Sequence, residues 1–245
     1  MRPQFFATTA PPRWALSPWA RLVRRATWRW EVARHVGYYC SPLRVEGAHH
    51  FSSVPKPVII IPNHASHFDT VVALHVIPPP LRSRTAIAAA ADRFYQTWWR
   101  SVRFSLRYNA FPIERGGGRR ALDYADELIE RGWSLVIYPE GHRSRDGRVQ
   151  PFHHGVSILA LQHRVPVLPV YMHGTAAIIP VGTKNATGPV PVTVTIGEPV
   201  LLDPSLSITE GTAVLEEAMR ALERRFLPEP GVEVAAVEGE PVAVS

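Results

Sequence analysis

Short runs of branched apolar residues recur along the chain, and many of them end at a proline or a glycine. Uninterrupted apolar runs of about four to eight residues are typical of strands that are buried on both faces of a parallel sheet. The pattern predicts six strands, which lie within residues 56–62, 85–91, 108–113, 134–139, 165–171 and 191–197.

Segments with helical spacing of apolar positions lie between these runs, and they predict helices within residues 68–76, 92–106, 118–132 and 155–164. A longer amphipathic pattern covers residues 207–227, with Ser207 or Thr209 as the candidate N-cap. Strands that alternate with helices indicate a single α/β domain with a mostly parallel central sheet flanked by helices. The length of 245 residues, with 46% hydrophobic content, is sufficient for one such core.

The two ends of the chain differ in composition from this central part. Residues 14 to about 38 predict a basic amphipathic helix or a pair of helices, which precedes the domain. Residues 1–36 contain seven arginines, one glutamate and four of the seven tryptophans, so they account for the whole net charge of +6. We therefore divide the chain into a basic segment rich in Trp and Arg (1–43), a folded domain (44–227) and an acidic tail expected to be disordered (228–245).

Arginine interleaved with tryptophan favours contact with an anionic membrane surface, where indole rings lie at headgroup depth. Nucleic acid is the less favoured partner because no nucleic-acid motif follows the basic segment, and an ordinary packed helix with solvated arginines is the simpler alternative. No run reaches the roughly 18 apolar residues of a spanning helix, and the N-terminus lacks a signal-peptide pattern. We expect a peripheral protein on the cytoplasmic side of the cell membrane, and the single Cys40 agrees with a reducing compartment.

A histidine and a carboxylate follow the first strong strand run: His64 comes directly after it, and Asp69 stands five residues later at the start of a predicted helix. If the chain turns there, Asp69 can accept a hydrogen bond from one ring nitrogen of His64 and leave the other nitrogen to take a proton. A pair that merely caps the helix is the common alternative. Ser66 as a nucleophile and a metal site of His64, His67 and Asp69 are two further alternatives, both disfavoured by the spacing.

Four motifs in order extend this observation. They are N-H-x-x-x-x-D at 63–69, "FPIER" at 111–115, "YPEGHRS" at 138–144 and "VPVLPVY" at 165–171. Together they resemble the motif blocks of the glycerolipid acyltransferases, the family of 1-acylglycerol-3-phosphate O-acyltransferases. The resemblance spans about residues 44 to 202, so it identifies the segment 44–227 as an acyltransferase domain.

The resemblance implies a role for each matching residue. His64 is the general base that deprotonates the acceptor hydroxyl, and Asp69 orients it. Arg115 is similar to a phosphate anchor, a role that suits its planar guanidinium. The remaining positions match substrate-binding residues of the family: Asn63, Glu140, Gly141, Arg143 and Ser144.

The implied reaction transfers an acyl group from acyl-CoA or acyl carrier protein to a lysophospholipid, with 1-acylglycerol-3-phosphate as the first-choice acceptor and phosphatidate as the product. It needs no metal and no bound cofactor. The alternatives are the same chemistry on another lysolipid or glycolipid, a non-catalytic lipid-binding module, and a metal-dependent hydrolase. The third block departs from the family at Tyr138 and His142, and His153 and His154 stand where lysines are frequent, which leaves the acceptor open.

Overall fold

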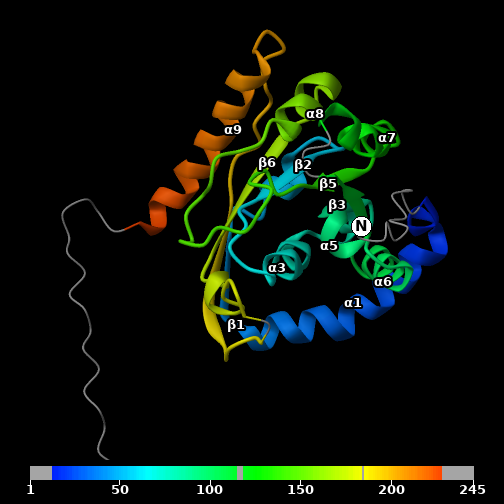
Figure 1. Ribbon diagram of the computed structural model, residues 1–245. Coiled ribbons are helices and arrows are strands. Elements are labelled where there is room, and N and C mark those ends of the chain that lie inside the picture. The colour runs from blue at the N-terminus through cyan, green and yellow to red at the C-terminus, as the bar shows by residue number, and fades with distance from the viewer. Residues whose placement is uncertain (1–12, 115–117, 184, 228–245) are drawn as a thin grey trace, which may run out of the picture.

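A seven-stranded sheet forms the centre of the structure (Figure 1). The computed structural model describes residues 13–114, 118–183 and 185–227, without the side chains of residues 29–31. The strands lie in the order β1-β7-β6-β2-β5-β3-β4, and every neighbouring pair is parallel except β6 and β7. The strands are β1 (Cys40–Glu46), β2 (Ile59–Pro62), β3 (Thr85–Ala90), β4 (Ala110–Ile113), β5 (Ser134–Val136), β6 (Val167–His173) and β7 (Val190–Ile196).

Helices connect these strands and cover both faces of the sheet, so the predicted α/β class with a mostly parallel sheet is confirmed. The α-helices are α1 (Pro18–Tyr39), α2 (His50–Ser53), α3 (Asp69–Val76), α4 (Pro79–Arg82), α5 (Ala91–Phe94), α6 (Trp98–Tyr108), α7 (Asp123–Glu130), α8 (Gly155–His163) and α9 (Ile208–Glu223). Short 3₁₀ turns are η1 (Arg13–Leu16), η2 (Gly118–Leu122), η3 (Thr175–Ala177) and η4 (Arg224–Phe226).

Two apolar clusters lie on opposite faces of the sheet, and strand β2 contributes to both. Ile60 packs into the cluster that includes residues of α1 and α3, whereas Ile59 and Ile61 pack into the cluster formed with α7, α8 and α9. Successive side chains of a strand point to opposite faces, so an unbroken apolar run is what a strand covered on both sides requires.

Helix α1 packs against the domain and passes directly into β1. Its buried residues Trp28, Val32 and Val36 belong to the same apolar cluster as Phe68 and Val72. Strand β1 begins at Cys40, a few residues before the proposed boundary at residue 43. The division of the chain into segments stays a prediction, but the basic helix clearly contributes to the core.

Three details differ from the sequence-based expectation. Strand β1 was not predicted because only Cys40 is buried within it, as suits an edge strand with no apolar run. The helix expected at 92–106 is divided into α5 and α6, and the one expected at 118–132 begins as the 3₁₀ turn η2.

Three further expectations concern the cap of α9, the C-terminal tail and membrane-spanning helices. Ser207, rather than Thr209, caps α9, in a reciprocal capping box with Glu210. The tail at 228–245 lies outside the described residues. In the described part of the chain, no helix has an apolar stretch long enough to cross a bilayer.

Candidate active site

A cleft of about 1320 Å³ opens at the carboxyl-terminal edge of the sheet. Its lining includes His64 after β2, Arg93 after β3, and Tyr138 and Arg143 after β5. Loops that follow neighbouring parallel strands converge at one edge of a sheet, and ligand sites of open α/β folds lie there. The cleft is therefore the candidate active site.

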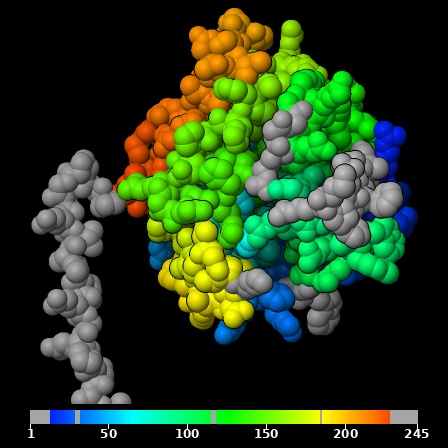
Figure 2. All heavy atoms as spheres, viewed as in Figure 1, coloured from blue at the N-terminus to red at the C-terminus, as the bar shows by residue number. Residues whose placement is uncertain are grey.

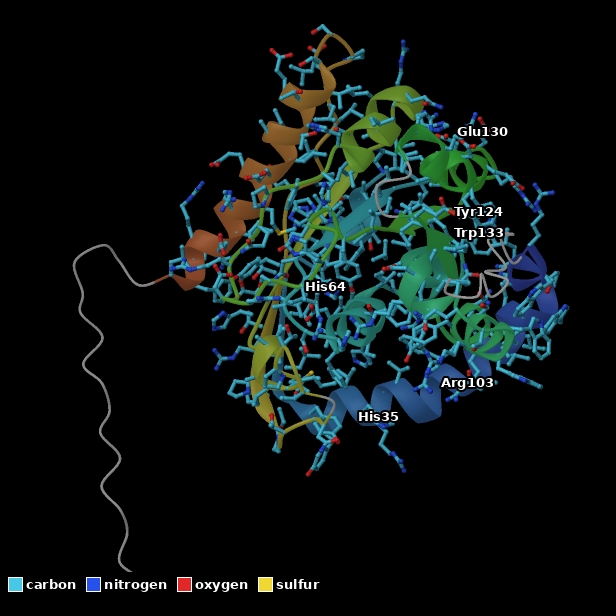
Figure 3. The ribbon with its side chains drawn as sticks, viewed as in Figure 1. His35, His64, Arg103, Tyr124, Glu130 and Trp133 are labelled. Atoms are coloured by element: carbon cyan, nitrogen blue, oxygen red, sulfur yellow. The ribbon has the colours of Figure 1, made fainter. Side chains whose placement is uncertain are left out.

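His64 and Asp69 are in direct contact in this cleft. The Nδ1 atom of His64 lies 3.0 Å from Oδ2 of Asp69, and His64 itself is near the centre of the molecule (Figure 3). Since a carboxylate accepts hydrogen bonds, Nδ1 carries the proton, and Nε2 is the nitrogen free to accept one. His64 is partly exposed to the cleft, whereas Asp69 is fully buried. This arrangement can take a proton from a bound hydroxyl group and stabilise the resulting imidazolium.

Asp69 is held at the beginning of α3 by the turn that precedes it. Its Oδ2 atom also accepts hydrogen bonds from the backbone N–H groups of Ala65 and Ser66, both at 2.7 Å. The hydroxyl group of Ser66 donates to the carbonyl of Ile179 and accepts from the N–H of Phe68, and the residue is buried. Ser66 therefore has a structural role, and the geometry does not support it as a nucleophile.

The main chain of His64 is held on both sides by the loop after β5. Its N–H donates to Oε1 of Glu140 at 2.7 Å, and its carbonyl accepts from the N–H of Ser144 at 2.7 Å. The second oxygen of Glu140 accepts from the N–H of Gln150 at 3.0 Å. Burial raises the pKa of Glu140 to about 8, against the lowering effect of these two N–H donors. Glu140 and Ser144 therefore position the histidine backbone.

Below pH 4.5, replacing Glu140 by glutamine should lower the free energy of unfolding by about 1–3 kcal/mol, because an amide NH₂ cannot accept from an N–H group, whereas both oxygens of the protonated carboxyl group can. The pKa of Glu140 rises from an ordinary 4.5 to about 8 on folding, so its stabilising contribution is present below pH 4.5 and is lost as the pH rises through 8. Urea unfolding at a series of pH values should show the parent losing stability relative to Glu140→Gln between those limits. The exposed variant Glu198→Gln is the control, and a pH-independent difference between parent and Glu140→Gln would contradict the assignment.

Tyr138 packs against the imidazole of His64, a contact that the sequence did not indicate. The two ring centroids lie 4.2 Å apart at an interplanar angle of 34°. The phenol oxygen of Tyr138 lies 3.0 Å from Oγ1 of Thr70 in α3. Burial, with a further effect of Asp69, raises the pKa of Tyr138 well above its ordinary value, so the phenol stays protonated. The tyrosine thus restricts the movement of the histidine ring.

Gly141 has a backbone conformation and surroundings that favour glycine. Its φ is +69°, and an added Cβ would lie 2.8 Å from Cδ2 of His153. The N–H of His153 donates to the carbonyl of Pro139 at 2.9 Å, so the turn and the start of the next segment are adjacent. Gly141 therefore permits a tight turn that keeps Glu140 and His153 together.

Two arginines, Arg93 and Arg143, line the cleft and lie near His67. Arg93 Nη2 lies 2.6 Å from Nε2 of His67, which acts as the acceptor. Burial, together with the nearby charges of Arg143 and Arg93, lowers the pKa of His67 to about 4, so this ring is neutral near pH 7. The Nη1 atom of Arg143 is buried and has no hydrogen-bond partner in the described part of the protein. Arg143 as a whole is partly exposed and lines the cleft, so its guanidinium can contact an anionic ligand group there and balance the charge of that group.

The other predicted site residues lie in different surroundings. Asn63 is buried and exchanges two hydrogen bonds with the main chain of Met172, at 3.2 and 2.7 Å, so its amide fixes the end of β2 to β6. Arg115 lies outside the described residues. His142, His153 and His154 line the cleft.

Metal binding receives no support from this geometry. In the described ranges, no three His, Cys, Asp or Glu side chains are grouped so that they could hold a metal ion. The nitrogen Nε2 of His67, one of the three ligands considered, faces the guanidinium of Arg93 instead.

Helix α9 supports the loop that carries Arg143, although sequence patterns did not connect the two. Glu223 Oε1 accepts from the N–H of Val149 at 2.8 Å, and Glu216 Oε2 accepts from the N–H of Phe152 at 3.0 Å. The loop and the orange helix lie side by side on the surface (Figure 2). The sequence indicates this support of the loop only by the spacing of Glu216 and Glu223, which places them two turns apart on one face of the helix.

Comparisons with known proteins identify the family of the chain. A family model described as Acyltransferase matches residues 42–173. A 1-acyl-sn-glycerol-3-phosphate acyltransferase from Limnanthes douglasii is 31% identical over 171 residues, which cover 67% of this chain and 57% of that protein. The human 1-acyl-sn-glycerol-3-phosphate acyltransferase alpha is 29% identical over 144 residues, or 56% of this chain and 48% of its own length. The chain thus spans about half the length of such relatives.

The fold has a similar counterpart among solved structures. The crystal structure of the 1-acyl-sn-glycerophosphate (LPA) acyltransferase PlsC from Thermotoga maritima superposes with a TM-score of 0.58 and 27% sequence identity. The match covers 84% of this chain and 78% of that protein.

Proposed function

The chain belongs to the acyltransferase family, and on that premise we propose that it transfers an acyl group from a thioester to the hydroxyl group of 1-acylglycerol-3-phosphate, which gives phosphatidate. The names of the relatives support this acceptor, and acyl-CoA or acyl carrier protein is the proposed donor. The observation that carries the proposal is the contact of 3.0 Å between His64 and Asp69 beside the cleft.

The proposed reaction follows from the protonation states in this pair. Nε2 of His64 takes the proton of the acceptor hydroxyl as its oxygen attacks the thioester carbonyl carbon, which forms a tetrahedral intermediate. The carbon–sulfur bond then breaks, the ester remains, and the leaving thiolate takes the proton from the imidazolium. Asp69 stabilises that imidazolium, so no metal or bound cofactor is required.

The activity is tested with the purified full chain. We expect release of free thiol from an acyl-CoA in the presence of 1-acylglycerol-3-phosphate, together with phosphatidate identified by mass spectrometry. A panel of lysophospholipids and acylated glycolipids, with acyl carrier protein as a second donor, identifies the preferred substrates. Product formation only from phosphate-free acceptors would favour another lysolipid or a glycolipid as the acceptor. Binding of lysolipid without any transfer would favour the non-catalytic lipid-binding module.

Two arginines of the cleft support a phosphate-bearing acceptor. Arg143 and Arg93 line the same cleft as His64. A phosphate group can accept from the guanidinium of Arg143 while the acceptor hydroxyl lies beside His64. Arg115, which is outside the described residues, is proposed as a further phosphate contact on the basis of the family motif alone.

Replacing Arg143 by glutamine should raise the KM for 1-acylglycerol-3-phosphate at least about tenfold, since a hydrogen bond to a charged group contributes about 1.5–3 kcal/mol. The KM for a phosphate-free lysolipid should change little, because that substrate lacks the matching charge. Steady-state kinetics on both acceptors measure the difference. Arg44→Gln, an exposed residue of the edge strand β1, is the control, and equal changes for both acceptors would argue against a phosphate contact.

We further propose that the protein lies on the cytoplasmic face of the cell membrane through its basic N-terminal segment. The exposed Trp19 and Leu22 of α1 and the arginine-rich composition of residues 1–36 support this location. Nucleic acid is not proposed as a partner.

A further inference from the structure

Helix α6 has an unusual distribution of polar and apolar residues, because its serines are buried and its tryptophans are exposed. Ser101 and Ser105 are 9% and 0% exposed, whereas Trp98 and Trp99 are 57% and 70% exposed. A helix packed on a soluble domain normally has the opposite pattern. The exposed end of α6 therefore needs a physical explanation.

Two contacts of Ser105 with other elements fix the orientation of the helix. Ser105 Oγ lies 3.2 Å from the phenol oxygen of Tyr95, and Arg24 of α1 donates to the carbonyl of Ser105 at 3.3 Å. Ser101 Oγ donates within the helix, to the carbonyl of Thr97 at 3.0 Å. Turning the tryptophans inward would break the two contacts of Ser105 and leave buried polar groups without partners.

The exposed residues of α6 match the chemistry of an anionic bilayer surface. Trp98 and Trp99 contact each other edge to face with their centroids 4.3 Å apart, and indole rings favour the boundary between headgroups and acyl chains. The sequence of α6 contains three arginines and no acidic residue, and Arg100 and Arg103 are exposed. Arg103 and α1 lie at the same edge of the molecule (Figure 3).

Helix α6 also forms part of the candidate active site. Phe104 and Tyr108 line the cleft, and Phe104 packs on Phe94 with a centroid distance of 4.3 Å. One helix thus connects the exposed tryptophans to the wall of the cleft. A bilayer in contact with Trp98 and Trp99 would be close to the entrance through which a lipid substrate reaches His64.

We propose that α6 is a second membrane-contact surface, in which Trp98 and Trp99 insert at headgroup depth and the arginines face anionic lipids. This contact is separate from the basic N-terminal segment, and it places the cleft at the bilayer. The entry of a lipid acceptor along α6 rests on the proposed function, whereas the membrane contact itself does not.

The test uses the full chain and vesicles of phosphatidylglycerol and phosphatidylcholine. The double variant Trp98→Ala/Trp99→Ala should bind these vesicles at least about tenfold more weakly, because it lacks the two indole rings whose apolar area would leave water on binding. Leu201→Ala is the matched control, since Leu201 is 67% exposed and belongs to neither α1 nor α6. Its vesicle binding should equal that of the parent. Circular dichroism should show that all three proteins are folded.

Two further measurements distinguish a membrane contact at α6 from a dimer contact there. Brominated lipids should quench tryptophan fluorescence less in Trp98→Phe/Trp99→Phe than in the parent, and turnover of a soluble short-chain acceptor should be unchanged in that variant. Unaltered vesicle binding and unaltered quenching would overturn the proposal. It would also be overturned if the parent sedimented as a dimer and the double variant as a monomer, since a second copy of the chain would then cover α6. Weaker vesicle binding by a chain that transfers no acyl group would support the membrane contact and contradict the proposed function.

Discussion

Replacing His64 by alanine should lower the kcat of acyl transfer by at least about a hundredfold, the usual contribution of a positioned general base. The variant removes the nitrogen that would take the acceptor proton, whereas the backbone bonds from His64 to Glu140 and Ser144 do not involve the side chain. Lysolipid binding should therefore persist. Thiol release from acyl-CoA, measured with saturating 1-acylglycerol-3-phosphate, gives kcat directly.

A histidine outside the cleft provides the control for this experiment. His49 is exposed beside α2 and does not line the cleft, so His49→Ala should transfer acyl groups at the parent rate. Thermal unfolding of both variants should show that they are folded. Parent-like turnover by His64→Ala would exclude His64 as the base and would also remove the main support for the mechanism.

We expect Asp69→Asn to lower kcat by about a hundredfold to ten-thousandfold, a range that reflects the loss of a carboxylate next to a catalytic histidine. The asparagine oxygen can still accept from the N–H groups of Ala65 and Ser66, so the turn before α3 should form. A neutral amide cannot stabilise the imidazolium that develops when His64 takes a proton. The KM for the acceptor should change little, because Asp69 is buried and lies behind the histidine.

The double variant His64→Ala/Asp69→Asn separates this effect from a general loss of structure. Once His64 is absent, the additional change at Asp69 should have little further effect on kcat, because the two residues act as a unit. Additive losses in the double variant would instead indicate that Asp69 acts through the fold. Urea unfolding of each protein measures its free energy of unfolding, so that a loss of kcat can be separated from a loss of stability.

The sequence predicted the strands whose two sides are both buried, because such strands are continuous apolar runs. Ile59–Pro62 in β2 and Val167–His173 in β6 are of this kind. Strand β1 was missed because it lies at an edge of the sheet and buries little more than Cys40. The basic helix α1 was expected from its charge and periodicity, but its packing through Trp28 and Val36 was not.

The pairing of His64 with Asp69 could be predicted because it is local: five residues separate them, and a turn into a helix brings them together. Other contacts of the site depend on the order of the strands. Arg93 reaches His67 across 26 residues, Tyr138 reaches Thr70 across 68, and Glu223 reaches Val149 across 74. The fold class and the contact between His64 and Asp69 were thus predictable from the sequence, because local periodicity and spacing encode both. The distant side chains that hold the histidine, and the face of α6 that is exposed, became known from the folded structure, because they depend on packing between elements that no local pattern specifies.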